Sequence, residues 1–379
     1  MNIAYVVVKH IARGGGIEKY TDELGARMVA RGHRVRVYSM GHYGPALSSH
    51  HGMEVVTVPC LPLPSCEKLS AGILATLHAS VSSWPDVIHL HSVGPGAFGW
   101  LPRVCHKPAV VQFHGLEWKR SRWGRTGVQV LQALERMSVK TNRHYTAVSK
   151  VQCDYFRETY GIETVYIPGG AEVKTPPPAQ ELYALGLEPK RYVLFASRLV
   201  HEKGAHDLIT AFRQLATTDK LVIAGDAPGA EVYQRTLRAL AGDDNRILFP
   251  GFVEGRLLAE LFSHARVYVQ PSTIEGLSIA LLEALSYGAC CLVSDIPENI
   301  EAIDTHGVVF RTGDCADLTA KLRWLLAMDD QEARFKANAI AHASTHYSWD
   351  HIADQFEHYY QMMLEQYAVT RHWKEPVEE

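Results

Sequence analysis

The 379-residue sequence lacks several features that mark whole classes of protein. No apolar run approaches the roughly 20 residues that a membrane-spanning helix needs. The first apolar run, residues 3–8, is too short for a secretory signal peptide and predicts a buried strand instead. With 38 Lys and Arg residues against 41 Asp and Glu, the formal charge is −3, so the overall field argues against nucleic acid as a partner.

Metal-binding patterns are missing as well. The seven cysteines are odd in number and show no C-x-x-C pair and no Cys/His spacing typical of a zinc site. This usage favours a reducing compartment, so we expect a cytoplasmic protein. No D-x-D pair occurs, which leaves the chain without a familiar motif for holding a divalent ion on a diphosphate.

Short β-branched apolar runs alternate with amphipathic runs along the chain, which predicts parallel sheets covered by helices. Six strands are expected in the first half, at residues 3–8, 34–39, 54–58, 86–91, 109–114 and 145–149. Six more are expected in the second half, at residues 192–197, 220–225, 247–250, 266–270, 289–294 and 307–310. The length exceeds one ordinary core, so we predict two doubly wound, Rossmann-like α/β domains facing each other across a cleft.

The boundary between the domains is predicted within residues 167–178, whose Pro and Gly content is typical of a linker. The first domain is expected to comprise residues 1–170 and the second residues 171–350. The tail predicts one long helix, about 351–370, with an apolar stripe formed by Ile352, Phe356, Tyr359, Tyr360 and Met363. This helix could cover its own domain or cross back to the first, and we favour the crossing.

The strongest functional signal is the stretch 275–283, Glu-Gly-Leu-Ser-Ile-Ala-Leu-Leu-Glu. It leads into a helix expected to begin near Leu277, whose free N–H groups would bind an anion beside Glu275. Glu283 lies about two turns further, on the order of 10 Å away by helix rise. The two carboxylates could therefore hold opposite ends of one extended ligand. A diphosphate between two polyol groups has about that length, which favours a nucleotide-sugar site.

Two cations follow the first strand of the second domain. Arg198 stands at the strand end and Lys203 just before a helix expected from Ala205, so one turn brings both cations to one place. Together with a helix N-terminus they could neutralise a leaving diphosphate without a metal ion. The turns at Gly225 and at Phe252-Val253 end the next two strands, where backbone groups could read a nucleobase. Ordinary turn chemistry explains those two turns equally well.

The first domain carries weaker signals. Glycines 14–16 stand between a strand and a helix, where the backbone could approach a phosphate or sugar closely, although an ordinary glycine turn is the alternative. His114 ends the fifth strand and could hydrogen-bond a sugar hydroxyl or a phosphate, or be structural. Residues 118–125 interleave two tryptophans with four cations. That composition suits an anionic acceptor, a membrane interface or a solvated loop.

In their order and spacing these motifs resemble those of retaining glycosyltransferases of family 4, which have the GT-B fold. The resemblance covers residues 3 to about 367. It rests on Arg198, Lys203-Gly204, Gly225-Asp226, Phe252, Glu275 and Glu283, with His114-Gly115 and Gly15-Gly16 in support. Two departures are visible. The turn Gly225-Asp-Ala-Pro-Gly differs from the usual G-D-G-P, and Ile167-Pro-Gly-Gly lacks a usual Asn.

The resemblance implies a role for each residue. Arg198 and Lys203 would bind the donor diphosphate, Glu283 the ribose hydroxyls, and Glu275 the donor sugar. His114 would contact that sugar near the reacting carbon. The implied catalytic residues are His114, Arg198, Lys203 and Glu275. The implied donor-binding residues are Gly15, Gly16, Arg198, Lys203, Gly225, Phe252, Val253, Glu275, Gly276, Leu277, Ser278 and Glu283. No metal and no cofactor are expected.

The expected function is metal-independent transfer, with retention, of a hexose or N-acetylhexosamine from a nucleoside-diphosphate sugar. UDP is favoured over GDP as the carrier, and the acceptor would be a saccharide or a lipid-linked group. The run from His114 to Arg120 resembles bacterial transferases that build capsular polysaccharide or exopolysaccharide, and residues 118–125 could touch the inner membrane. Alternatives are an epimerase or sugar phosphorylase on the same scaffold, or a nucleotide-sugar-binding module without activity. An oxidoreductase is disfavoured because neither first turn has the dinucleotide-binding spacing.

Overall fold

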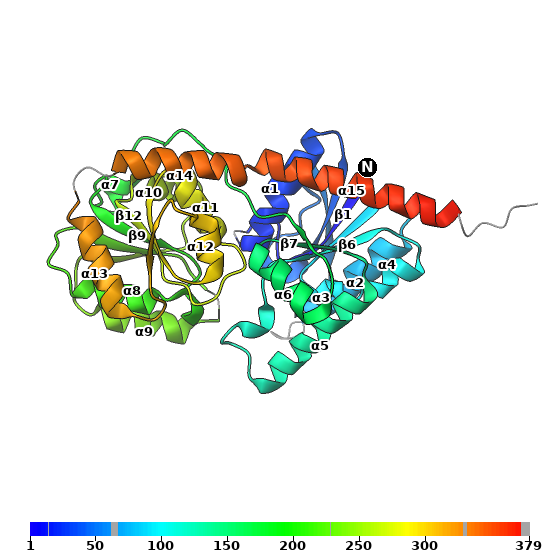
Figure 1. Cartoon of the computed structure of the whole chain (residues 1–379), viewed down its shortest axis with the longest axis horizontal. Helices are drawn as coiled ribbons and strands as arrows, with labels where there is room; N and C mark the ends of the chain where they lie inside the picture. Colours follow the sequence, from blue (N-terminus) through cyan, green and yellow to red (C-terminus); the bar gives the residue numbers. More distant parts are fainter. Residues whose placement is uncertain (14, 62–66, 228, 329–331, 373–379) are drawn as a thin grey trace, which may run out of the picture. The chain divides into compact units, whose positions relative to one another are not determined.

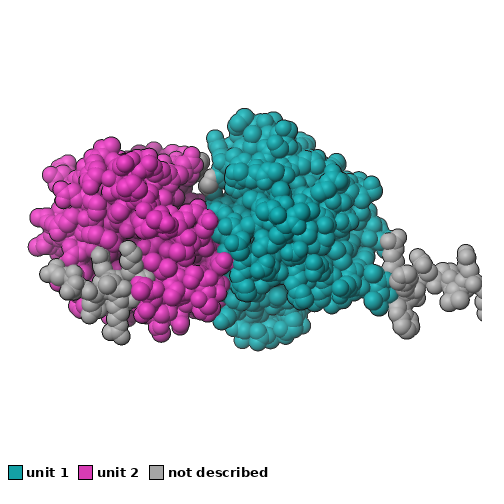
Figure 2. Space-filling view, turned by 90° about the horizontal axis from the view of Figure 1, so that it is seen from above, with its two compact units in different colours: residues 1–169, 349–379 teal, residues 170–348 magenta. Residues whose placement is uncertain are grey.

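The structure, a computed structural model, describes residues 1–372 apart from residues 14, 62–66, 228 and 329–331 (Figure 1). The chain divides into two compact units (Figure 2). The first consists of Met1–Gly169 with Trp349–Glu379, and the second is Gly170–Ser348. Both units are doubly wound α/β domains, as the sequence predicted.

The first unit is built on an eight-stranded sheet with the order β3-β4-β2-β1-β5-β6-β7-β8. Every neighbouring pair is parallel except β3 with β4. The strands are β1 (Asn2–Val8), β2 (Arg34–Met40), β3 (Ser49–His50), β4 (Met53–Val58), β5 (Val87–His91), β6 (Ala109–Phe113), β7 (His144–Ala147) and β8 (Val165–Tyr166). The six predicted strands are confirmed, and the two-residue strands β3 and β8 were not predicted because runs so short carry no periodicity.

The helices of the first unit cover both faces of its sheet (Figure 1). They are α1 (Gly16–Ala30), α2 (Glu67–Val81), α3 (Val93–Gly96), α4 (Trp100–Val104), α5 (Arg125–Thr141), α6 (Lys150–Tyr160) and α15 (Trp349–His372), with single 3-10 turns η1 (Gly41–Tyr43) and η2 (Glu117–Lys119).

The two faces of this sheet differ in chemistry. Successive residues of a strand point to opposite faces. Ile88 and Leu90 of β5 therefore join an apolar cluster with α2 and α6, whereas His89 and His91 point toward α15 and α1, where they contact Tyr360 and Thr21. The face toward α2 and α6 is thus apolar, whereas the face toward α1 and α15 combines apolar residues such as Ile3 and Val37 with buried histidine, tyrosine and amide groups.

Helix α15 packs against α1 in the first unit, as the favoured arrangement predicted. All five residues of its predicted apolar stripe are buried. Ion pairs fix the outer side: Arg27 Nε lies 3.1 Å from Asp350, and Arg31 Nη2 lies 2.8 Å from Asp354. The last helix of the chain is therefore a structural part of the first unit.

The second unit is built on a six-stranded, wholly parallel sheet with the order β11-β10-β9-β12-β13-β14. The strands are β9 (Tyr192–Ala196), β10 (Lys220–Ala224), β11 (Ile247–Gly251), β12 (Val267–Gln270), β13 (Cys290–Ser294) and β14 (Val308–Phe310). The helices are α7 (Glu181–Ala184), α8 (Ala205–Arg213), α9 (Glu231–Ala241), α10 (Gly255–His264), α11 (Ile279–Ser286), α12 (Pro297–Ile303), α13 (Cys315–Leu326) and α14 (Glu332–His346), with one 3-10 turn η3 (His201–Lys203). All six predicted strands are confirmed.

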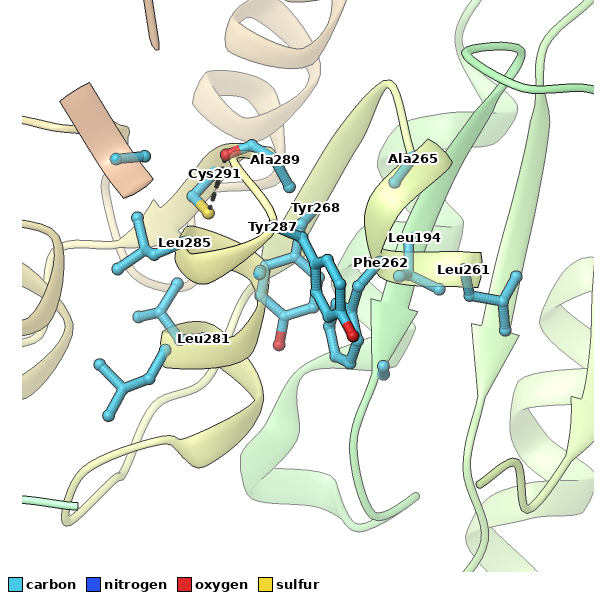
Figure 3. Close-up of a cluster of buried hydrophobic side chains, with 14 of the residues drawn as sticks. Leu194, Leu261, Phe262, Ala265, Tyr268, Leu281, Leu285, Tyr287, Ala289 and Cys291 are labelled. Atoms are coloured by element: carbon cyan, nitrogen blue, oxygen red, sulfur yellow. Dashed lines mark hydrogen bonds between the residues drawn. The ribbon is translucent and has the colours of Figure 1, made fainter. Parts of the chain in front are cut away.

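Both faces of the second sheet are apolar. Val193 and Phe195 join one cluster, with helices α8 and α13, and Leu194 joins another, with helices α10 and α11. Figure 3 shows part of the second cluster, where the ring centroids of Phe262 and Tyr268 lie 5.6 Å apart. Such near-continuous apolar strands are typical of parallel sheets with helices on both faces. None of the helices in the described part of the chain combines the length and apolar character needed to cross a bilayer.

Candidate active site

The predicted site residues are divided between the two units. Gly15, Gly16 and His114 belong to the first unit, and the others belong to the second. Most of them follow the carboxyl ends of parallel strands, where ligands of open α/β sheets bind.

Backbone hydrogen bonds join the turns that follow β9, β10 and β11. Ser197 N–H donates to the Ala224 carbonyl at 3.1 Å, and Gly225 N–H donates to the Gly251 carbonyl at 2.7 Å. Gly225 has φ +141°, and a Cβ atom there would lie 1.8 Å from the Ser197 carbonyl oxygen. Only glycine allows this approach, so the predicted Gly225 turn is part of a tightly fitted backbone surface.

The turn η3 is joined in the same way to the loop that follows β12. Thr273 N–H donates to the Glu202 carbonyl at 2.9 Å. Gly204 has φ +71°, and a Cβ atom there would lie 2.1 Å from the Pro271 carbonyl oxygen. These contacts bring Lys203 beside Glu275, although 72 positions separate them in the sequence.

Lys203 and Glu275 form an ion pair. Lys203 Nζ lies 2.5 Å from Glu275 Oε1, and the two side chains are 11% and 6% exposed. The sequence predicted that Lys203 binds the diphosphate and Glu275 approaches the sugar, but it did not predict that they bind each other. The pair is formally neutral, and the other predicted cation, Arg198, is exposed after the end of β9.

Helix α11 begins at Ile279, two residues later than predicted. Ser278 caps it, because the Ser278 hydroxyl oxygen accepts a hydrogen bond from Leu281 N–H at 3.3 Å. The Ser278 hydroxyl in turn donates to Gln270 Oε1 at 2.7 Å. The predicted donor-binding backbone, residues 276–278, is therefore an extended segment before the helix, held in place by its own cap.

A buried network of side-chain amide and hydroxyl hydrogen bonds supports this segment. Gln270 Nε2 donates to Asn299 Oδ1 at 2.6 Å, and Asn299 Nδ2 donates to Ser294 Oγ at 2.9 Å. Ser294 Oγ donates to the Ser272 carbonyl. These residues come from β12, β13 and α12, so the network fixes three elements around the start of α11. The sequence analysis missed Gln270 and Asn299, whose only signal is a polar residue at a buried position.

Glu283 lies in α11 and is half-buried. Burial raises the pKa of the nearby Tyr268 hydroxyl well above its usual range, and the charges of Cys291, Glu275 and Glu283 raise it further. The Tyr268 hydroxyl therefore stays uncharged beside both carboxylates. Val253 packs against the apolar cluster. By contrast, the side chain of Phe252 is 54% exposed, which leaves its ring accessible at the end of β11.

In the first unit, the glycine turn forms the start of α1. Gly15 is the N-cap residue, with extended backbone, and α1 begins at Gly16. Glu18 reaches back over the turn, because its Oε1 accepts a hydrogen bond from Lys9 N–H at 3.0 Å. A Cβ atom at Gly15 would meet the Glu18 carboxylate at 2.2 Å, whereas Gly16 has open space around it. Gly14 lies outside the described residues.

His114 follows β6 and bonds another histidine. Its Nε2 lies 3.0 Å from Nδ1 of His91, at the end of β5, and Nε2 of His91 lies 3.2 Å from the hydroxyl of Thr21. Burial lowers the pKa of His114 to about 3, against an opposing effect of Glu117. Burial also lowers the pKa of His91 well below its usual range. Both imidazoles are therefore neutral at physiological pH.

A second chain of hydrogen bonds lies beside the first. Tyr360 of α15 bonds His89 Nδ1 at 2.6 Å, and His89 Nε2 bonds Gln112 Oε1 at 3.0 Å. Gln112 Nε2 donates to the Tyr20 hydroxyl at 2.6 Å. Tyr20 then packs its ring edge-on against His114, with centroids 5.1 Å apart. Burial lowers the pKa of His89 to about 3. The strand-end histidine thus sits on a fully buried polar support that the sequence analysis did not predict.

The loop with two tryptophans presents its cations rather than its indoles. Trp118 Nε1 donates to the buried Glu135 carboxylate at 3.2 Å, and Trp123 is half-buried. Arg122 is exposed, and its guanidinium lies over the ring of Trp123 at 4.5 Å from the centroid. Within the same loop, Arg120 and Arg122 lie 2.9 Å and 3.7 Å from the carboxylate of Glu117.

Within the described ranges, two groups bring His and carboxylate ligand atoms within 4.8 Å of one another. They are Asp22 with His50 and His51, and Asp304 with His306 and His342. In the first, His51 Nδ1 already forms a 2.8 Å hydrogen bond with Asp22. Neither group contains a predicted site residue.

Two family models match the chain in succession. The model described as Glycosyltransferase Family 4 matches residues 14–174, and the model described as Glycosyl transferases group 1 matches residues 184–342. The first match lies almost wholly in the first unit, and the second lies within the second unit. The family resemblance that the motifs indicated is therefore shown for both halves of the chain.

Similar proteins agree with this assignment. The chain is 28% identical over 375 residues to D-inositol 3-phosphate glycosyltransferase of Xylanimonas cellulosilytica, with 89% of each chain covered. The fold is similar to that of sucrose-phosphate synthase of Thermosynechococcus elongatus, with a TM-score of 0.84, 21% identity and coverage of 96% and 99%. It is also similar to HepE of Anabaena in complex with UDP-glucose, with a TM-score of 0.79, 19% identity and coverage of 95% and 99%. The chain belongs to the family 4 type of glycosyltransferases and has the GT-B fold.

Proposed function

We propose that this glycosyltransferase moves a hexose or N-acetylhexosamine from a nucleoside-diphosphate sugar to an acceptor hydroxyl, with retention and without a metal ion. The observation that carries the proposal is the contact of Lys203 with Glu275 beside the start of α11. This contact joins a cation and a carboxylate next to the N-terminus of a helix, which supports binding of a diphosphate beside a sugar.

In the proposed reaction, the bond between the sugar C1 and the β-phosphate oxygen breaks, and C1 forms a bond with the acceptor oxygen on the same face. The acceptor proton passes to the departing phosphate. Arg198 and Lys203 stabilise the negative charge that develops on this phosphate, and Glu275 orients the sugar. Glu283 accepts hydrogen bonds from the ribose hydroxyls. We propose metal independence because Arg198, and Lys203 once the diphosphate competes with Glu275 for it, would supply the counter-charge.

UDP is the carrier that we propose first, and GDP is the second candidate. HepE, which shares the fold, was crystallised with UDP-glucose. In this chain the exposed ring of Phe252 and the backbone of the Gly225 turn are available to a nucleobase. Backbone groups and an aromatic face accept several bases, so the preference for UDP rests on the structural relative.

For the acceptor we propose a saccharide or lipid-linked group that carries negative charge. The exposed side chains of Lys119, Arg122 and Arg125 support this choice, with Arg122 also 3.7 Å from Glu117. One relative is named for an inositol phosphate substrate. We further propose that the enzyme works in the cytoplasm in bacterial polysaccharide or glycoconjugate synthesis. The same cations would allow peripheral contact with anionic lipids of the inner membrane.

A thermal-shift panel tests the donor. UDP, GDP, ADP and their glucose and N-acetylglucosamine derivatives are compared with and without EDTA, because stabilisation by a ligand grows with its affinity. We expect UDP-glucose or UDP-N-acetylglucosamine to raise the melting temperature most, and EDTA to change nothing. If no nucleoside diphosphate or sugar nucleotide stabilises the enzyme, the proposed donor class is wrong. Turnover of the hit without acceptor would indicate an epimerase or a hydrolase, and turnover that requires phosphate a phosphorylase.

The role of Glu283 gives a sharper test. Replacing it with Ala removes a charged acceptor for the ribose and is expected to weaken UDP binding by about 1.5–3 kcal/mol. Glu188→Ala, an exposed carboxylate in the same unit, is the matched control and should leave binding unchanged. Glu275→Ala should mainly lower turnover. Calorimetric titration that gave equal UDP affinities for wild type and Glu283→Ala would exclude the ribose role.

A further inference from the structure

The hydrogen positions around His114 follow from the groups that surround it. The Thr21 hydroxyl lies 2.8 Å from the Ile17 carbonyl oxygen and 3.2 Å from His91 Nε2. A carbonyl oxygen can only accept, so the single hydroxyl proton points to Ile17. The contact with His91 then requires a proton on His91 Nε2, which donates to the Thr21 oxygen.

The proton on His91 fixes the proton on His114. His91 is fully buried and surrounded by other histidines, which keeps its pKa low and its ring neutral. A neutral imidazole that carries its proton on Nε2 has a lone pair on Nδ1. That Nδ1 lies 3.0 Å from His114 Nε2, so His114 must donate here. A low pKa keeps His114 neutral too, and its own Nδ1 therefore carries a lone pair.

This lone pair is available to a ligand. His114 is half-buried, and the residues that the structure describes provide no hydrogen-bond partner for its Nδ1. His89 and His91 have no ring nitrogen left for a ligand, because both nitrogens of each ring are hydrogen-bonded within the unit. His114 is thus the end of the chain that leads from Ile17 through Thr21 and His91.

We propose that Thr21 and His91 are positioning residues that hold His114 as the neutral Nε2–H tautomer, so that its Nδ1 accepts a hydrogen bond from a hydroxyl or amide N–H of the donor sugar. The inference rests on the proposed function, in which His114 contacts that sugar. It adds a rule of specificity: the sugar group at His114 must donate. A fluorine, an ether oxygen or a carboxylate in its place would oppose its own lone pairs to that of Nδ1.

The tautomer can be measured in the ligand-free, full-length enzyme. Long-range ¹⁵N–¹H spectra of histidine-labelled protein distinguish protonated from unprotonated ring nitrogens, and loss of one signal set in His114→Gln assigns the residue. We expect a protonated Nε2 and an unprotonated Nδ1 in His114 near neutral pH. A protonated Nδ1 would overturn the proposal, whatever the enzyme transfers.

Thr21→Val tests the relay, and Thr21→Ser is its matched control. Valine has nearly the shape of threonine but no hydroxyl, so His91 Nε2–H loses its acceptor. His91 is then free to move its proton to Nδ1, which turns His114 into the Nδ1–H form. We expect the His114 spectrum to switch in Thr21→Val and to stay unchanged in Thr21→Ser. An unchanged His114 tautomer in a folded Thr21→Val enzyme would show that Thr21 does not position it.

Donor analogues test the specificity rule. UDP-glucose is compared with its monodeoxyfluoro analogues, in which fluorine replaces one hydroxyl at a time and cannot donate. For the hydroxyl that contacts His114, we expect affinity to fall about tenfold in the wild type and in Thr21→Ser, and much less in Thr21→Val. Equal affinities for all analogues would overturn the acceptor role. If UDP-glucose itself fails to bind, the proposed donor is wrong, and the tautomer measurement still decides the relay.

Discussion

The two units of this transferase build their parts of the candidate site from different materials. In the first unit the side chains form it: His91 ends β5, His114 follows the neighbouring β6, and both lie among buried polar groups. In the second unit the backbone does most of it, because turns such as those at Gly204 and Gly225 pack directly against neighbouring carbonyl groups.

This difference sets how each unit can fail. A surface made of fitted backbone tolerates no added atoms, because main-chain groups cannot rotate away as side chains do. A layer of buried histidines tolerates small changes in shape, but it is stable only while each imidazole is uncharged. We therefore expect the second unit to be sensitive to Cβ atoms at its turns and the first unit to be sensitive to pH.

Gly225→Ala should have the largest effect. The added Cβ atom would lie 1.8 Å from the Ser197 carbonyl, so the turns after β9 and β10 would have to separate. We expect the free energy of unfolding of the second unit to fall by about 4 kcal/mol or more. Urea denaturation, with hydrogen exchange of the β9 and β10 amides as the readout, measures this loss of unfolding free energy.

Gly313→Ala is the matched control for that substitution. Gly313 also has a positive φ, of +76°, but nothing lies within 4 Å of its Cβ position. Only the cost of a left-handed alanine remains, about 1–2 kcal/mol. If the two variants lost equal stability, the close approach at Gly225 would not matter, and the contrast between the units would lose its main support.

The stability of the first unit should decrease as the pH falls, by a smaller amount than Gly225→Ala costs the second unit. The pKa values of His89 and His114 are about 3 in the folded chain, below the usual 6.5. The unfolded chain therefore binds more protons as pH falls below 6.5, and stability that is complete above that value is lost progressively toward pH 3. Between about pH 7.5 and about pH 5.5, we expect each histidine to contribute a loss on the order of 1 kcal/mol, and the two together a loss of a few kcal/mol.

Protection factors from hydrogen exchange separate this effect by unit. Amides of β5 and β6 should lose protection on acidification, and amides of β9 and β12 should lose less. Burial also lowers the pKa of His206 and of His342 in the second unit, so a smaller loss is expected there as well. Equal losses of protection in both units would mean that the buried histidines of the first unit do not make it less stable than the second at low pH.

The fold was predictable from the sequence because its signals are local. Alternation of strand and helix patterns gave both sheets, and the stripe from Ile352 to Met363 matches the buried side of α15. The contacts of the site were less predictable. Lys203 meets Glu275 and His91 meets His114 through pairings of distant segments, which leave no spacing to recognise. The start of α11 was predicted two residues early because Ser278, an N-cap residue, was counted in the helix.

The smallest effect that we expect concerns the ion pair, and it joins stability to function. Lys203→Met and Glu275→Gln each leave one group of the pair without its partner, so the double variant should be more stable than the sum of the single losses predicts. We expect a coupling energy of about 2 kcal/mol, measured by urea denaturation in a double-mutant cycle. Glu275→Gln should also bind UDP at least as tightly as wild type, because Lys203 no longer has a carboxylate that competes with the diphosphate. Weaker UDP binding to a folded Glu275→Gln enzyme would mean that the pair itself, rather than the released lysine, forms the diphosphate site.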